Sequence, residues 1–283
     1  DVPINLLTVY DSIEKHFYVW GLNPYTPSIP NCTYVHCAND RELLIAFQEK
    51  WREDPPDLLT AWNLEGFDLP YIINRSKRVL DEEFAKRFSP VGNIYSREFL
   101  GKYGKMQEKW YIEGVSCADY LDIYKKFIFV NRESYKLDHI AEIEIGESKL
   151  DYGDEGLFYL MKNNWKVFTD YNIHDVNLIV KLDAKLNFIS LLRNLAYTGL
   201  STFEAAMGTV AIVTGAVEIK ARFRNQHVPT FIRNSDTGKN PGAYVAEPRA
   251  GFQECIVSFD ANSLYPNIMI SLNLSPETKI GKI

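Results

Sequence analysis

Cysteine is scarce in this sequence, with only four among 283 residues. Cys32 and Cys37 flank His36, but no second ligand pair follows at the spacing of a zinc site. We therefore expect structural or free thiols in a reducing, cytoplasmic compartment. The sequence also lacks an apolar run of the roughly 20 residues that cross a bilayer, and it lacks signal-peptide features. A membrane protein and a disulfide scaffold are thus disfavoured.

Positive charge is also in short supply, because 31 Lys and Arg face 37 Asp and Glu, giving a net charge of −6. This balance alone disfavours a nucleic-acid binder, although a large acidic enzyme can keep a local basic channel. Basic residues do gather around residues 97–109 and 220–239, where solvated surface is the alternative interpretation. The apolar content of 46% is ordinary for a globular chain of one or two domains.

The hydrophobic pattern predicts an α/β (α+β) fold with a mixed sheet and flanking helices. Strands are expected at residues 4–12, 16–22, 33–38 and 57–62, and an exposed basic hairpin at 93–113. Asn39 and Glu42 form a capping box that opens a helix, Pro70 opens a second helix covering 71–84, and the pattern from 155 to 200 is helical. A polar stretch at 218–250 marks a domain boundary.

Two acidic motifs occur in the first two-thirds of the chain. Asn63, Phe67 and Asp68 stand in the expected loop NLEGFD, and Tyr171 and Asp175 stand four apart in the helical segment YNIHD, where they share a face. Two-metal phosphodiester hydrolysis needs carboxylates that converge from different elements, and Mg²⁺ prefers such oxygen ligands. Asp68 and Asp175 are the candidate ligands, Tyr171 can orient water, and Asn63 and Phe67 can hold a single-stranded end. A helix-capping Asp68 and a solvated Asp175 are the alternatives.

A third acidic motif lies near the C-terminal end. The apolar run at 254–260 predicts a buried strand that ends in Asp260, a candidate ligand bridging two metal ions. The backbone at Ala261, Ser263 and Leu264 is expected to meet triphosphate oxygens, and the Tyr265 ring to lie against the deoxyribose. A strand end with a capping Asp260 and a core Tyr265 is the alternative.

Together these motifs resemble those of family B DNA polymerases of the T-even-like bacteriophage type. NLEGFD and YNIHD resemble the second and third exonuclease motifs. PGAYVAEP at 241–248 resembles the junction between the two catalytic domains, and DANSLYPNI resembles polymerase motif A. The resemblance covers nearly the whole chain, and the motifs follow the family order. Asn267 departs mildly, because serine is common there.

The resemblance implies a ribonuclease H-like 3′–5′ exonuclease domain at 1–187, a return to the N-terminal domain at 188–231, and the beginning of the palm domain at 232–283. It implies a DNA-directed DNA polymerase with proofreading activity, using two Mg²⁺ per site, with Mn²⁺ as a possible substitute. The implied partners are primer–template DNA, a single-stranded 3′ end and deoxynucleoside triphosphates, with a sliding clamp or a remaining polymerase chain left open. The hairpin at 93–113 resembles the one that helps to separate the primer end from its template.

The resemblance also implies that the chain is an internal fragment or one piece of a split polymerase, inactive alone. The first exonuclease motif, Asp-x-Glu, finds no match at Asp11 or Glu14, and the later palm motif, fingers and thumb find none either. The alternative is a non-catalytic DNA-binding piece that needs a partner chain. A stand-alone ribonuclease H-like nuclease is a third reading, disfavoured because it leaves the C-terminal motif without a use.

Overall fold

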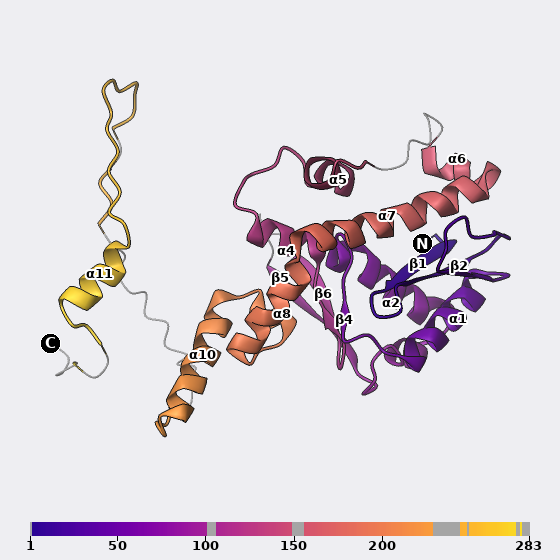
Figure 1. Ribbon diagram of the computed structural model, residues 1–283, viewed down its shortest axis with the longest axis horizontal. Helices are drawn as coiled ribbons and strands as arrows, with labels where there is room; N and C mark the ends of the chain where they lie inside the picture. The colour runs from indigo at the N-terminus through magenta and orange to yellow at the C-terminus, as the bar shows by residue number, and fades with distance from the viewer. Residues whose placement is uncertain are drawn as a thin grey trace. The chain divides into compact units, whose positions relative to one another are not determined.

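The computed structural model describes residues 2–100, 106–148, 156–228, 244–247, 249–275 and 278. It divides into two units, Asp1–Pro229 and Thr230–Ile283 (Figure 1). The predicted motif at 241–248 is described only at residues 244–247. In the described residues, no helix combines the length and apolar character needed to cross a membrane. All four cysteines are free thiols.

A three-stranded mixed sheet organises the first unit. Strands β1 (Leu6–Asp11) and β2 (His16–Gly21) pair antiparallel, and β3 (Cys32–His36) pairs parallel to β2. Alternating side chains face opposite sides of such strands. Leu7 and Trp20 therefore join one apolar cluster while Phe17 and Val19 join another. The predicted hairpin and third strand are confirmed.

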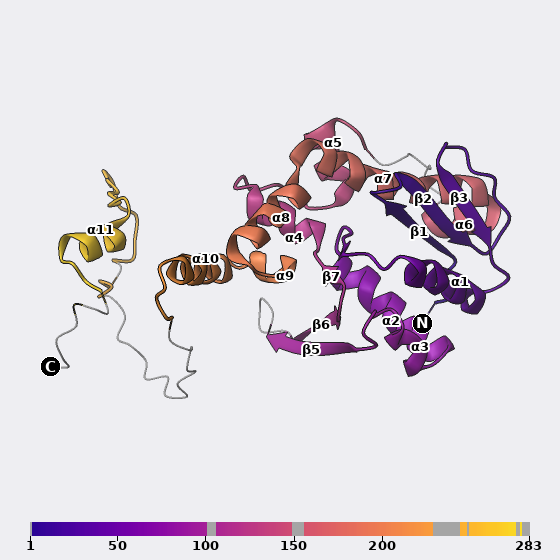
Figure 2. The ribbon, with the colours of Figure 1, turned by 60° about the horizontal axis from the view of Figure 1, so that its bottom comes forward.

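Helices cover both faces of this sheet (Figure 2). On one face lies α1 (Asp40–Glu53), where Asn39 accepts a hydrogen bond from the Glu42 amide, as the predicted cap requires. On the other face lies α7 (Trp165–Leu186), whose Ile173 packs against the sheet. Helices on two faces of a mixed sheet are the predicted α/β arrangement.

A second, short parallel pair carries the first acidic motif. Strand β4 (Leu58–Leu59) pairs with β7 (Ser116–Cys117). The chain leaves β4 through a π-helical turn, η1 (Leu64–Asp68), and enters α2 (Leu69–Val79). The predicted helix over 71–84 is wrong in extent: α2 ends at Val79, and Asp81 caps a separate helix, α3 (Glu82–Lys86), by accepting from the Phe84 amide.

The predicted basic hairpin is confirmed as β5 (Ile94–Leu100) and β6 (Met106–Ile112) in antiparallel register. Tyr95 and Tyr111 stack across it, with ring centroids 5.1 Å apart. Arg97 lies over both rings, so an aromatic and cationic ladder runs along one face. Lys102 and Lys105 lie outside the described residues.

The remaining helices of the first unit form a second apolar cluster around Tyr120, Ile123 and Leu192. They are α4 (Tyr120–Phe127), α5 (Leu137–Ile145), α8 (Phe188–Gly199), α9 (Phe203–Ala206) and α10 (Thr209–Phe223). The other helix, α6 (Gly156–Asn163), lies against α7. The helical prediction for residues 155–200 is confirmed over its described part. Helix α10 contacts α8 backbone to backbone, because a Cβ built on Gly215 would lie 1.8 Å from the Gly199 carbonyl oxygen.

The described part of the second unit contains one α-helix, α11 (Leu264–Ser271). The predicted buried strand at 254–260 is wrong here, because those residues are exposed and unpaired. Apolar strand residues become buried only when neighbouring strands and a facing layer cover them. The described residues of this unit supply no strand that could do so.

Candidate active sites

The motif NLEGFD is a helical turn and not the loop predicted for it. Asn63 adopts the left-handed conformation with φ 66°, and its carbonyl accepts from the Gly66 and Phe67 amides at 3.2 and 3.0 Å. A Cβ at Gly66 would lie 2.5 Å from the Asn63 Oδ1, so glycine permits the tight turn. The turn leaves Asn63 exposed and presents the Phe67 ring to solvent at 60% exposure, stacked at one side on Tyr71.

Asp68 ends this turn directly before α2, yet its side chain makes no helix cap. The capping alternative is therefore not what the structure shows. Partial burial, together with the smaller effect of the nearby negative charge of Asp119, raises the pKa of the Asp68 carboxyl to about 6. No described Lys or Arg forms a salt bridge with it. A desolvated carboxylate without a cation is destabilised when ionised, so the group suits a bound cation or a proton.

Asp119 is a site residue that the sequence patterns did not reveal. It is 6% exposed and follows β7, just as Asn63 follows the parallel strand β4. Its Oδ1 accepts from the Asn63 and Leu121 amides at 3.0 and 2.9 Å, and its Oδ2 accepts from the Glu65 amide at 3.1 Å. One carboxylate thus caps α4 and the turn η1. The cap on α4 could be predicted, because an Asp before a helical segment is a common cap residue. The cap on η1 could not, because it depends on amides 54 and 56 residues away in the sequence.

A partly buried ion pair joins the same turn to the hairpin. Glu65 accepts a hydrogen bond from Lys109 of β6 at 2.5 Å, and both side chains are about one-fifth exposed. Burial raises the pKa of Glu65 above its usual value, although Lys109 acts in the opposite sense. Burial alone would lower the pKa of Lys109, but Glu65 raises it above the ordinary value. The pair therefore ties the turn that bears Asp68 to the hairpin.

The second predicted pair, Tyr171 and Asp175, lies on α7 as expected, one turn apart. Tyr171 is buried at 7% exposure, and Asp175 is half-buried. Asp68 and Asp175 therefore come from two different elements, as the two-metal hypothesis requires. Across the described ranges, however, no three His, Cys, Asp or Glu side chains gather closely enough to hold a metal ion.

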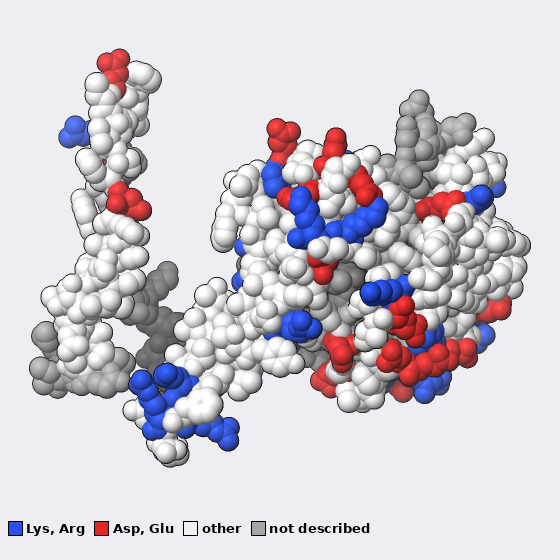
Figure 3. Space-filling model, in the orientation of Figure 1, with Lys and Arg blue, Asp and Glu red and all other residues white. Residues whose placement is uncertain are grey.

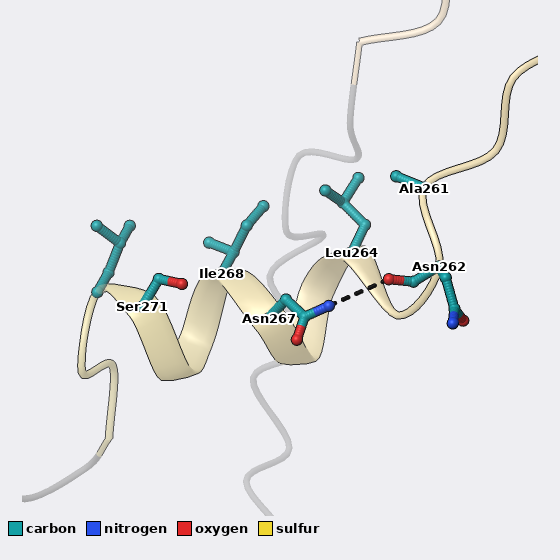
Figure 4. Close-up of a pocket in the computed structure, with 7 residues that line it drawn as sticks. Ala261, Asn262, Leu264, Asn267, Ile268 and Ser271 are labelled. Atoms are coloured by element: carbon teal, nitrogen blue, oxygen red, sulfur yellow. Dashed lines mark hydrogen bonds between the residues drawn. The ribbon is translucent and has the colours of Figure 1, made fainter.

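The third predicted group forms the start of α11 in the second unit. Ala261 and Leu264 line an open hollow together with Asn262, Asn267, Ile268, Ser271 and Leu272 (Figure 4). The Asn267 side-chain amide donates to the Asn262 carbonyl at 3.1 Å and so braces the turn into the helix. Asp260 is exposed, and Tyr265 is 66% exposed, so neither the capping nor the core alternative describes them here.

Comparison with known proteins assigns both units to one class, the DNA polymerases. Residues 4–140 match the family description "DNA polymerase family B, exonuclease domain", and residues 206–282 match "DNA polymerase family B". The chain belongs to DNA polymerase family B. The resemblance seen in the sequence motifs is thereby confirmed, and the mixed α/β first unit is consistent with the ribonuclease H-like exonuclease fold predicted for it.

Among the similar proteins are two phage enzymes, each named DNA-directed DNA polymerase. The protein of Escherichia phage RB69 is 34% identical over 99% of this chain and 33% of its own length. That of Enterobacteria phage T4 is 34% identical over 100% of this chain and 34% of its own length. The DNA polymerase catalytic subunit of human herpesvirus 7 is 29% identical over 94% of this chain and 27% of its own length. The chain spans about a third of the length of these relatives.

Proposed function

We propose that this chain forms part of a DNA-directed DNA polymerase with 3′–5′ proofreading activity. The observation that carries the nuclease half is Asp68: a half-buried carboxylate with a pKa raised to about 6, no helix cap and no described cationic partner. The family assignment and the phage relatives support the polymerase half. Relatives from phages make the host-cell cytoplasm the proposed compartment.

Asp68 and Asp175 would hold Mg²⁺, or Mn²⁺ in its place, in the nuclease site. Their carboxylate oxygens fit hard divalent ions, and a cation would offset the desolvation that raises the pKa of Asp68. Bound metal supplies water activation and stabilises the leaving oxygen. We assign Tyr171, one helical turn from Asp175, to the orientation of the attacking water.

The substrate of this site is proposed to be a single-stranded DNA 3′ end. Asn63 is exposed for hydrogen bonding, and the exposed Phe67 ring offers a stacking face to a terminal base. The hairpin β5–β6 reaches the same turn through Lys109 and Glu65. This connection supports the proposal that the hairpin helps to pass a separated primer end to the site.

A basic cluster at the end of α10 is a further proposed DNA contact. Lys220, Arg222 and Arg224 are exposed and make no salt bridge with any residue the structure describes (Figure 3). Phe223 lies between the two arginines at 84% exposure. Cations interleaved with an aromatic ring suit phosphates and a stacked base. Solvated surface, the alternative, predicts no salt-dependent contribution to DNA binding.

For the second unit we propose the beginning of a polymerase palm domain. Asp260 would bind the metal ions, the backbone at Ala261, Ser263 and Leu264 the triphosphate of a deoxynucleotide, and Tyr265 the deoxyribose. We retain the domain limits 1–187, 188–231 and 232–283 as part of this proposal. A sliding clamp or a further polymerase chain would complete the assembly.

Incubation of the chain with 3′-labelled single-stranded DNA and Mg²⁺ tests the nuclease proposal. Because the resemblance implies a chain that is inactive alone, we expect little or no shortening by the wild type. Any Mg²⁺-dependent shortening that does occur should be lost in Asp68→Asn and kept in Asp54→Asn, an exposed aspartate on α1's C-terminal side. Shortening that persists in Asp68→Asn would refute the assignment. Tight DNA binding that depends neither on Mg²⁺ nor on Asp68 would favour the alternative of a non-catalytic piece that needs a partner chain.

DNA affinity at several salt concentrations tests the α10 cluster. Arg222→Gln/Arg224→Gln should weaken binding of an oligothymidylate and reduce the slope of log affinity against log salt by about 1 to 1.5. The matched double variant Arg41→Gln/Arg52→Gln, on the exposed surface of α1, should not. Equal slopes in the two variants would identify the α10 cluster as solvated surface.

A further inference from the structure

The strongest unassigned feature is the carboxylate of Asp119, which lies behind the turn that bears Asp68. It accepts three backbone hydrogen bonds, two of them from Asn63 and Glu65 in that turn. It is buried and charged, and no side chain of the turn itself caps η1. The first amides of a helical turn have no partner within the turn, and Asp119 supplies acceptors for the amides of Asn63 and Glu65.

We propose that Asp119 is a positioning residue for the nuclease site, a proposal that rests on the function assigned above. Its two oxygens fix two amides of the turn relative to the rigid pair β4 and β7. Thr60 Oγ1 donates to the Ala118 carbonyl at 2.6 Å, and the Tyr120 amide donates to the Ala61 carbonyl at 3.0 Å, so both segments are joined directly beside Asp119. The joined segments that follow β4 and β7 thereby determine the direction in which the Asp68 side chain leaves the turn.

The left-handed backbone of Asn63 gives this anchor a further structural role. A non-glycine residue at φ 66° is strained, and such a conformation persists only where its surroundings hold it. The Asp119 Oδ1 bond to the Asn63 amide and the Oδ2 bond to the Glu65 amide hold it from one side. The ion pair of Glu65 with Lys109 holds it from the other. Loss of Asp119 would release the turn and misplace Asp68 and Phe67.

The chain offers a matched control for this role. Asp81 also caps a helix with its carboxylate, accepting from the Phe84 amide at 2.6 Å, but that cap serves α3 alone. Asp119→Ala and Asp81→Ala each remove an N-terminal cap. Only Asp119→Ala also removes two acceptors from the turn that bears Asp68. Asp119→Asn keeps the oxygen that can face Asn63 and loses the acceptor for Glu65, which makes it a partial rescue.

Two measurements on the intact chain test the proposal. Amide hydrogen exchange at Asn63 and Glu65 should accelerate at least about 10-fold in Asp119→Ala, less in Asp119→Asn, and not in Asp81→Ala. Mn²⁺ affinity, measured with the metal alone, should fall about 10- to 100-fold in Asp119→Ala and remain at the wild-type value in Asp81→Ala. If Asp119→Ala does not fold, Asp119→Asn provides the same two readings.

Unchanged exchange at the two amides would overturn the anchoring. Accelerated exchange with unchanged Mn²⁺ affinity would overturn the positioning role. Failure of the proposed function is separate: Mn²⁺ binding that is the same in the wild type and in Asp68→Asn would refute the metal assignment, while exchange at Asn63 and Glu65 would still decide whether Asp119 anchors the turn.

Discussion

Replacing Asp68 with asparagine should stabilise the chain at neutral pH. Burial raises the folded-state pKa of this carboxyl from 3.8 to about 6. At about 1.4 kcal/mol per pKa unit, its ionisation costs the folded state up to about 3 kcal/mol. Partial solvent contact reduces this value, so we expect a gain of about 1–3 kcal/mol in the free energy of unfolding for Asp68→Asn at pH 7.

The pH dependence has a definite sign. Between pH values of about 4 and 6 the folded chain keeps a proton on Asp68 that the unfolded chain has already lost. The stability contributed by this group therefore falls as pH rises through that window and is constant above it. The difference in stability between Asp68→Asn and wild type should be near zero at pH 4 and reach its full size by pH 7.

Urea unfolding at pH 4, 5, 6, 7 and 8 measures this difference, with Asp54→Asn as the exposed control. Mg²⁺ should add stability to the wild type above pH 6, because a ligand that binds only the folded state stabilises it, and it should add none to Asp68→Asn. Parallel stability curves for wild type and Asp68→Asn across the whole range would refute the argument that Asp68 is a strained, metal-ready carboxylate.

Three further substitutions test the packing of the first unit by chemical denaturation. Gly215→Ala should cost about 1–3 kcal/mol, because its Cβ would overlap the Gly199 carbonyl and push α10 from α8; an unchanged midpoint would contradict this contact. Leu43→Ala should cost about 2–5 kcal/mol, since Leu43 is fully buried, and a loss below 1 kcal/mol would show that the core relaxes around it. Asn39→Ala should cost about 1 kcal/mol by removing the cap on the Glu42 amide, and Asn39→Asp should restore most of it.

Local patterns predicted the sheet and its flanking helices well, because their physics is local. The two strands of the first hairpin alternate between two apolar clusters, as a period of two requires. The cap at Asn39 depends on a residue three positions away. The break between α2 and α3 was also local, since Asp81 is an ordinary cap residue, but the apolar spacing on both sides of it resembled one continuous helix.

Features that depend on distant parts of the chain could not be predicted from local sequence patterns. The turn at Asn63 is helical because a carboxylate 56 residues later satisfies its amide, and no spacing rule links the two positions. The ion pair of Glu65 and Lys109 spans 44 residues. The apolar segment at 254–260 has the composition of a strand, yet a strand needs partners, and the described residues of its unit provide none.

The motif NLEGFD alone does not predict the charged groups that surround Asp68. Burial is the largest cause of the raised pKa values of Asp68, Glu65 and Asp119. The charge of Asp119 adds to the rise at Asp68 and Glu65, and that of Asp122 adds to the rise at Asp119 and Glu65. Lys109 is the described cation that offsets this charge, and it is already paired with Glu65. Replacing Asp119 would remove one negative charge near Asp68, but it would also remove the hydrogen bonds that hold the turn. Asp119 is therefore proposed to fix the position of Asp68 while its own negative charge disfavours ionisation of Asp68. A bound divalent cation would offset the repulsion between the two carboxylates and leave the hydrogen bonds of Asp119 in place.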